Sequence, residues 1–380
     1  MKQKEFFGKD SIYKLKEILD EHKPKSIFLV TGKSSYEKSG ASGKLGEMLK
    51  GYNAIHFTDF NPNPKLEEIE NGLNIFRENK CDFLIAVGGG SPIDVAKSVS
   101  ILDANPGDAV DYINKKRKIE KKGKILVAIP TTSGSGSEAT YFIVFYKGKT
   151  KCSLGHEEFT LPDYAIVDPV LTDSLPKYQT ACTGMDALGQ AIESYWCVDS
   201  TEESKNYAAE AIKLAMEFLE EAVNNPSYKA REAMAKSANL AGKAINISRT
   251  TACHAVAYPI TSYFGIPHGH AVGLTIPSML VHNYRVNEGE LLDKRGISYV
   301  KKTIEEISSL VGAKTVDEAA KKINELMSRI GLKIRLSELD IKTESDREII
   351  LKNGFNPGRV KNNPRVLTEE ALRVIISEID

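Results

Sequence analysis

The sequence has little cysteine, no excess of charge and no long hydrophobic run. Its five cysteines among 380 residues form no C-x-x-C pair, which argues against a disulfide scaffold and favours reduced thiols. Lysine plus arginine and aspartate plus glutamate both number 51, so no net charge would draw the chain to nucleic acid or an anionic membrane. Neither an apolar run of about 18 residues nor a signal-peptide pattern is visible. We therefore expect a cytoplasmic protein without nucleic-acid or membrane partners.

The first half of the chain alternates β-rich runs with helical patterns. "SIFLV" (26–30), "DFLIAVGG" (82–89) and "KILVAIP" (124–130) predict strands, and "LEEIENGLNIFREN" (66–79) and "DVAKSVSIL" (94–102) predict helices. This alternation is typical of a parallel sheet with helices on both faces. The first half is therefore predicted to be an α/β domain.

The character of the sequence changes near residue 178. Strand-like runs disappear, and long helical patterns such as "TEESKNYAAEAIKLAMEFLEEAV" (201–223) take over. A chain of 380 residues also exceeds the size of most single hydrophobic cores. We predict an α/β domain with a parallel sheet over residues 1–178, followed by an all-helical domain over residues 179–380.

Two stretches of small residues follow successive predicted strands. "AVGGGSPIDVAK" (86–97) ends a strand and opens a helix, and "PTTSGSGSEAT" (130–140) follows the next strand. Glycines let a phosphate approach the backbone, and a helix N-terminus attracts its charge. The spacing is not G-x-G-x-x-G, so a tight strand–helix turn is an alternative. Two such stretches at the ends of neighbouring strands favour one extended phosphate-bearing ligand.

Three of the seven histidines fall within residues 254–270, two of them in "GIPHGH". Upstream, Asp186 and Gln190 are four residues apart in the helical pattern "TGMDALGQAIESY", so they share one helix face. A buried carboxylate without a partner is costly, so Asp186 needs a cation, a helix N-terminus or several donors. A divalent metal shared with His254 and His268 would meet that need. Buried histidines that make ordinary hydrogen bonds are the alternative.

Six segments together make the chain resemble the iron-containing (group III) alcohol dehydrogenase family. They occur in the family's order between residues 30 and 375: "GGGSPIDVAK", "PTTSGSGSEAT", "LPDYAIVDP", "TGMDALGQAIESY", "CHAVAYPITSYFGIPHGHAVGL" and "NNPRVLTEEAL". The resemblance implies a dinucleotide-binding α/β domain, a helical metal-binding and substrate domain, and NAD(P)-linked reduction of a small aldehyde to a primary alcohol.

The resemblance also implies a set of metal ligands. Asp186, His254 and His268 take three of the family's four ligand places, and Gln190 stands where a histidine is usual. An amide oxygen ligates a divalent ion more weakly than imidazole does. We expect Fe²⁺ first and Zn²⁺ second.

Two residues near these ligands are candidates for proton transfer. Tyr258 stands where the family usually has another histidine, and its phenol would either donate a proton to the alkoxide or shape the pocket. His270 lies two residues beyond His268. It would either take over the proton role or bond a backbone carbonyl.

The cofactor prediction rests on the end of the first long strand. Members specific for NAD commonly carry an aspartate at the place of Gly32, where its charge repels a 2′-phosphate. Gly32 removes that repulsion, and Lys33 and Ser34 would bind the phosphate. We predict NADP(H) rather than NAD(H). The other cofactor-binding residues that the resemblance implies are Asn63, Gly89, Gly90, Ser91, Asp94, Thr131, Thr132, Ser135 and Lys151.

The substrate prediction rests on cations near the ligands. Arg249 precedes His254 by five residues, where most family members look uncharged, and His156 is a further candidate contact. Such cations would hold an anionic tail; a structural or surface arginine is the alternative. The segments around Asp186 and His254 look most like the phosphonoacetaldehyde reductase branch, which reduces phosphonoacetaldehyde to 2-hydroxyethylphosphonate.

Other functions stay open at this point. One alternative is a general short-chain alcohol dehydrogenase of the same family, and another is a non-catalytic nucleotide-binding relative, which Gln190 would fit. A lyase related to dehydroquinate synthase fits the second-domain motifs poorly. We also expect a homo-oligomer.

Overall fold

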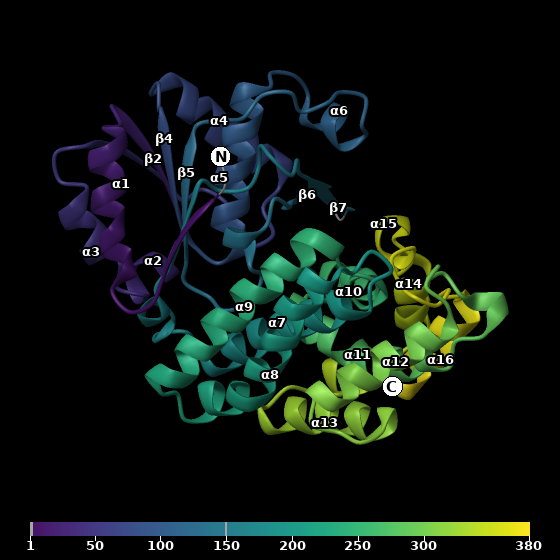
Figure 1. Ribbon diagram of the computed structural model, residues 1–380. Coiled ribbons are helices and arrows are strands. Elements are labelled where there is room, and N and C mark those ends of the chain that lie inside the picture. Colours follow the sequence, from purple (N-terminus) through teal and green to yellow (C-terminus); the bar gives the residue numbers. More distant parts are fainter. Residues whose placement is uncertain (1–2, 149) are drawn as a thin grey trace. The chain divides into compact units, whose positions relative to one another are not determined.

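The computed structural model describes residues 3–148 and 150–380. The chain divides into two compact units, residues 1–175 and 176–380 (Figure 1). The first contains a parallel sheet and the second is helical, as the sequence predicts. Each unit is described by itself below.

The first unit is built on a six-stranded sheet with the order β1-β8-β5-β4-β2-β3, in which every pairing is parallel. Its strands are β1 (Lys4–Phe7), β2 (Ser26–Thr31), β3 (Asn53–Phe57), β4 (Phe83–Gly88), β5 (Ile125–Pro130) and β8 (Tyr164–Val167). The strands predicted from apolar runs, β2, β4 and β5, occupy the centre of the sheet. They are almost entirely buried, as strands covered on both faces must be.

Helices cover both faces of this sheet. Alternate residues of β2 and β4 point to opposite sides: Leu29 and Ile85 join one hydrophobic cluster, and Phe28 and Leu84 join the other. The first cluster includes α1 (Lys14–His22) and α3 (Ala41–Met48), and the second includes α4 (Leu66–Glu78) and α5 (Gly90–Ala104). The short helices α2 (Ser35–Lys38) and α6 (Ala109–Ile113) complete this unit, together with an antiparallel hairpin of β6 (Ile143–Lys147) and β7 (Thr150–Leu154).

The second unit is a helical bundle around α7 (Lys177–Trp196), which is buried along most of its length. Its other helices are α8 (Glu202–Asn224), α9 (Tyr228–Ser248), α10 (Ala252–Phe264), α11 (His268–Tyr284), α12 (Ile297–Leu310), α13 (Val316–Arg329), α14 (Glu344–Asn353), α15 (Pro357–Val360) and α16 (Glu369–Glu378). Helices α8, α9, α11 and α12 all contact α7. The central helix therefore carries its polar side chains into the interior of the unit.

Two properties bear on the expectations from composition. None of the helices that the structure describes combines the length and apolarity that crossing a lipid bilayer requires. All five cysteines are buried and free. The thiols are therefore unpaired, as their spacing suggested.

Candidate functional site

The predicted phosphate-binding stretches meet at one edge of the parallel sheet. The amide of Gly32 donates to the Val87 carbonyl (3.4 Å), and the amide of Thr131 donates to the Gly88 carbonyl (2.9 Å). These bonds tie together the carboxyl ends of β2, β4 and β5. In open parallel sheets, ligands bind at this edge.

The glycines of the first stretch pack against hydroxyl side chains of the second. A Cβ atom added to Gly89 would lie 3.3 Å from Thr132 Oγ1, and one added to Gly90 would lie 3.0 Å from Ser135 Oγ. These distances leave little room for a larger side chain. Gly90 also opens α5, so the unbonded amides at this helix N-terminus lie at the same edge of the sheet.

A buried polar network fixes the second stretch against α5. Lys97, which is 1% exposed, donates to the carbonyls of Ser137 (2.6 Å), Thr140 (2.7 Å) and Phe142 (3.0 Å). Asp94 accepts from the Ser137 hydroxyl at 2.8 Å. Burial raises the pKa of Asp94 to about 6 and lowers the pKa of Lys97 to about 8. Both groups are therefore mainly charged at neutral pH, and each offsets part of the other's burial cost.

The remaining predicted cofactor residues lie around these stretches. Lys33 and Ser34 are exposed after β2, and the backbone amide of Asn63 donates to Ser91 Oγ (3.2 Å). Lys151 lies on β7, close enough to Asp94 to lower that carboxyl's pKa. The first unit thus places the predicted cofactor residues on β7 and on the segments that follow β2, β3, β4 and β5.

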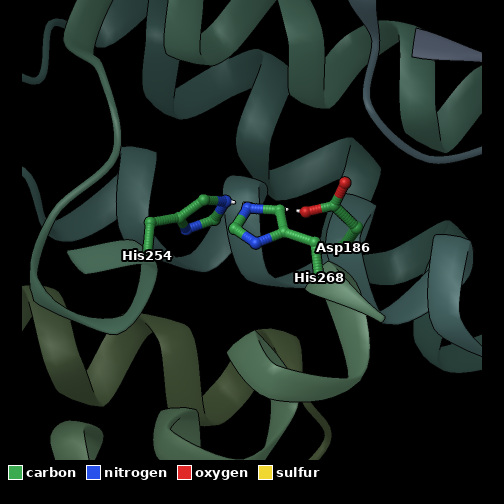
Figure 2. Close-up of side chains that lie close together, drawn as sticks. All are labelled: Asp186, His254 and His268. Carbon is green, nitrogen blue, oxygen red and sulfur yellow. Dashed lines mark ion pairs between the residues drawn. The ribbon is translucent and has the colours of Figure 1, made fainter. Parts of the chain in front are cut away.

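Three predicted metal ligands come together in the second unit. Asp186 on α7, His254 on α10 and His268 at the start of α11 each place one ligand atom within 4.8 Å of the others (Figure 2). Asp186 is 8% exposed and His254 is 4% exposed. The imidazole rings of His254 and His268 are 5.2 Å apart between centroids. Two nitrogens and one carboxylate oxygen converging in this way form a donor set suited to Fe²⁺ or Zn²⁺.

Glu193, which the sequence analysis missed, fixes one of these ligands. It is 0% exposed on α7, and its Oε1 accepts from the backbone amides of Thr251 (3.1 Å), Cys253 (2.8 Å) and His254 (3.3 Å). The carboxylate thereby caps the N-terminus of α10. Its other oxygen, Oε2, accepts from His254 Nδ1. A carboxylate on the far nitrogen of a metal-binding histidine fixes the ring and its tautomer.

The free side of that imidazole faces Asp186. His254 Nε2 is buried without a hydrogen bond, and Asp186 Oδ1 lies 3.6 Å from it. Burial lowers the pKa of His254, but the carboxylates of Glu193 and Asp186 outweigh this effect and raise it to about 9. The pocket therefore stabilises positive charge where His254 Nε2 points. The residues present fit a divalent cation bound there.

Close helix packing brings His268 to this cluster. A Cβ atom added to Gly269 would collide with the Cys182 carbonyl oxygen and crowd Asp186. Only glycine lets the first turn of α11 approach α7 so closely. The glycine after His268 therefore has a steric role in placing that histidine.

Gln190 and Tyr258 lie around the three-residue cluster. Gln190 is 5% exposed on α7, one helical turn after Asp186. The ring of Tyr258 stacks on that of His268, with 5.8 Å between centroids and 23° between planes. Its hydroxyl accepts a hydrogen bond from Arg359 Nε at 3.1 Å. Arg359 is a second neighbour of the cluster that the sequence analysis missed.

His270 is held by two hydrogen bonds. It is 1% exposed, and its Nε2 donates to the Lys333 carbonyl at 2.7 Å. Its Nδ1 lies 3.2 Å from the Tyr178 hydroxyl. Of the two roles considered for His270, these contacts favour the structural one.

The two predicted substrate residues lie in different units. Arg249 follows the last residue of α9 and is half-buried, with φ 79° and ψ 172°. That conformation is costly for any residue but glycine. His156 lies after β7 in the first unit, where its ring stacks on Phe159 at 4.2 Å. The structure therefore places only Arg249 in the unit that contains the metal cluster.

Comparison with known proteins places the chain among metal-dependent dehydrogenases. The family described as iron-containing alcohol dehydrogenase matches residues 3–169, and the C-terminal part of the Fe-containing alcohol dehydrogenase family matches residues 180–379. Long-chain-alcohol dehydrogenase 1 of Geobacillus thermodenitrificans is 41% identical over 234 residues, which are 61% of this chain and 59% of that protein.

Two further similar proteins are reductases. Phosphonoacetaldehyde reductase of Streptomyces viridochromogenes is 31% identical over 315 residues, which are 80% of this chain and 77% of that protein. The crystal structure of sulfoacetaldehyde reductase from Bifidobacterium kashiwanohense in complex with NAD⁺ is similar to this one, with a TM-score of 0.88. The sequences of the two chains are 32% identical. That likeness covers 99% of this chain and 96% of the other.

Proposed function

Because this chain belongs to the iron-containing alcohol dehydrogenase family, it is an NAD(P)-dependent alcohol dehydrogenase or aldehyde reductase, and we propose that it reduces phosphonoacetaldehyde to 2-hydroxyethylphosphonate with NADPH. The observation that carries the reductase chemistry is the cluster of buried Asp186 and His254 with half-buried His268, and Glu193 lies behind His254. The substrate and the 2′-phosphate preference are the finer parts of the proposal.

In this proposal Asp186, Gln190, His254 and His268 hold the metal. When bound, the metal supplies Lewis acidity at a carbonyl oxygen, and a dihydronicotinamide supplies the hydride. Glu193 keeps His254 Nδ1 protonated, so that Nε2 is the nitrogen available for ligation.

Other side chains of the chain bind the cofactor and move the proton. The two glycine- and hydroxyl-rich stretches bind the pyrophosphate, while Lys33 and Ser34 bind the 2′-phosphate. Tyr258 donates the proton to the product alkoxide, because its ring lies against His268. His270 contributes indirectly by holding the start of α11 in place.

Arg249 supports an anionic substrate. The described residues contain no carboxylate in ion-pairing distance of its side chain, although its backbone adopts a strained conformation. Strain of this kind persists where the surrounding structure imposes it and often marks a binding site. Two of the similar proteins are named for aldehydes that carry an anionic group. His156 is a weaker candidate for the same tail.

A panel of aldehydes tests this proposal. The purified chain, loaded with Fe²⁺ or Zn²⁺, is assayed for oxidation of NADPH and NADH with phosphonoacetaldehyde, sulfoacetaldehyde and propanal. We expect the highest kcat/KM for phosphonoacetaldehyde with NADPH. Arg249→Ala should lower that value by about 10- to 150-fold, which corresponds to the free energy that a hydrogen bond to a charged group contributes. Arg249→Lys should recover only part of it, because an ammonium lacks the planar fork.

The alternatives give different results in the same assay. A preference for propanal would leave a general short-chain alcohol dehydrogenase. Absence of cofactor oxidation with every aldehyde would instead indicate a non-catalytic nucleotide-binding relative.

A further inference from the structure

Trp196 and Thr251 continue the buried hydrogen bonds that hold Glu193. Trp196, the last residue of α7, is 1% exposed, and its Nε1–H donates to Thr251 Oγ1 at 2.8 Å. Thr251 is 0% exposed directly before α10, and its hydroxyl donates to Glu193 Oε1 at 2.7 Å. Glu193 Oε2 in turn accepts from His254 Nδ1. Four buried side chains are therefore connected in one row that ends at a predicted metal ligand.

The direction of each bond in this row follows from the chemistry of its members. An indole nitrogen is a donor only, and an ionised carboxylate is an acceptor only. The Thr251 hydroxyl has a single proton, so it accepts from Trp196 and gives that proton to Glu193. Glu193 has no proton to offer, so His254 Nδ1 is the donor of the next bond. The lone pair of that imidazole is therefore on Nε2, the atom that lies 3.6 Å from Asp186 Oδ1.

Thr251 does not cap α10 in the usual way. A threonine in this position normally accepts from the second or third amide of the helix. Here the amides of Cys253 and His254, which hold those places, donate to Glu193 Oε1 instead (2.8 and 3.3 Å). Among the residues that the structure describes, the Thr251 hydroxyl has no capping bond to α10, and its bonds go to α7. It is therefore a partner of the carboxylate rather than a helix cap.

The row passes back and forth between two helices. Trp196 and Glu193 are three residues apart on α7, and Thr251 and His254 are three apart at the start of α10, so each pair shares a face. Every bond of the row crosses from one of these elements to the other. The route from Trp196 and Thr251 to the metal ligand passes through Glu193.

We infer that Thr251 is a positioning residue of the metal site, held as a donor by Trp196. Its hydroxyl orients the Glu193 carboxylate, which keeps His254 Nδ1 protonated and leaves Nε2 free for the cation. This inference rests on the proposed function, because a chain that binds metal needs His254 in this tautomer. It extends the site by two residues that touch neither the metal nor the substrate.

Zinc affinity of Thr251 variants tests this role. The chain is stripped of metal, and Zn²⁺ binding is measured by competition with a fluorescent chelator. Thr251→Val keeps the shape of the side chain without its hydroxyl, and it should weaken Zn²⁺ binding about 3- to 10-fold, which corresponds to one ordinary hydrogen bond. Thr251→Ser keeps the hydroxyl and should bind Zn²⁺ nearly as tightly as the wild type. Binding of NADPH should not change in either variant.

Thr303→Val is the matched control. Thr303 is 3% exposed on α12, and its hydroxyl accepts from Lys205 Nζ at 3.0 Å. The substitution makes the same change at another buried, hydrogen-bonded threonine of the same unit. It should lower the melting temperature as Thr251→Val does, but Zn²⁺ affinity should stay at the wild-type value. If Thr251→Val does not fold, Thr251→Ala and Thr251→Ser decide, since both lack the methyl group and only Thr251→Ala lacks the hydroxyl.

A double variant shows whether Thr251 acts through Glu193. Glu193→Gln alone should weaken Zn²⁺ binding, and adding Thr251→Val should then weaken it little further, because the hydroxyl has already lost its charged partner. Independent roles would multiply the two losses instead.

The results separate this inference from the function on which it rests. Equal Zn²⁺ affinities of Thr251→Val and Thr303→Val, equal affinities of Thr251→Ala and Thr251→Ser, or multiplied losses in the double variant would overturn the role of Thr251 while the metal site still stands. A wild-type chain that binds no Zn²⁺ would overturn the metal site and the proposed function with it.

Discussion

The two predicted sites of this chain are built from different materials. The cofactor site in the first unit consists of glycines, hydroxyls and backbone amides at the ends of β2, β4 and β5, with Lys97 and Asp94 buried behind it. The metal site in the second unit consists of charged and aromatic side chains on three long helices, with Glu193 buried behind it. Behind each proposed site lies a buried charged side chain that holds neighbouring backbone groups in place.

The difference shows what each kind of site requires from the fold. A phosphate binds to backbone amides and needs space beside them, so the proposed cofactor site depends on glycines, which have no side chain. A divalent cation needs oriented lone pairs, so the second site depends on side chains held in one rotamer and one tautomer. Substitutions at the two buried charges should therefore have separate effects on NADPH and on metal.

The largest effect is expected from Lys97→Met. The substitution leaves Asp94 buried without its cation and leaves three carbonyls without a donor, which should cost about 3–5 kcal/mol of stability. The KM for NADPH should rise while metal content is retained. Unfolding followed by circular dichroism measures the loss of stability in the whole chain. Fluorescence of Trp196, the single tryptophan, follows the second unit, where the change should be smaller.

The matched control for that experiment is Lys16→Met, because Lys16 is exposed on α1. It should leave both stability and the KM for NADPH close to those of the wild type. A Lys97→Met variant as stable as Lys16→Met would show that the buried network does not hold the cofactor stretch.

The next effect concerns the choice of dinucleotide at Gly32. Gly32→Asp should weaken the binding of NADPH about 100-fold more than the binding of NADH, because the aspartate carboxylate would face the 2′-phosphate, which carries the same sign of charge. A side chain at this position also crowds Ser35 Oγ, which must rotate away. Gly32→Asn has the size of the aspartate without its charge and should affect both cofactors equally. Isothermal titration with both dinucleotides gives the comparison; equal weakening by the aspartate would contradict the NADP(H) assignment.

A smaller effect is expected from Glu193→Gln. An amide can still accept from the α10 amides, but it no longer fixes the protonated Nδ1 of His254 with a negative charge. Metal affinity should fall by about 10- to 100-fold, the usual effect of removing such a partner. Competition with a fluorescent chelator measures the affinity, and NADPH binding should not change. Glu217→Gln, on the exposed side of α8, is the control. Equal metal affinities in the two variants would show that Glu193 does not contribute to metal binding.

Much of the fold could be predicted because buried central strands and long helices have clear periodicity. β2, β4 and β5 are apolar throughout, and their runs stand out in the sequence. β3 was missed because most of its residues are exposed, and the hairpin of β6 and β7 because it pairs outside the main sheet. The sequence holds little signal for such elements, whose pairing depends on the rest of the fold.

The residues of the candidate site could be predicted where a motif places them on one helix. They were harder to predict where the fold brings distant segments together. Asp186 and Gln190 were identified by their spacing. Glu193, three residues further, continues the same face, and this was the signal that could have found it. Nothing in the sequence pairs Arg359 with Tyr258, because that contact depends on the packing of α15 against α10.

Metal stoichiometry is the most direct test of the central claim that Asp186, Gln190, His254 and His268 hold a divalent cation. The chain is stripped with a chelator, reloaded with Fe²⁺ or Zn²⁺ and desalted, and its metal is measured by elemental analysis beside His268→Ala. The account predicts one ion per wild-type chain and less than about a tenth of that in the variant, with NADPH bound equally by both. Equal metal content in the two proteins would contradict it.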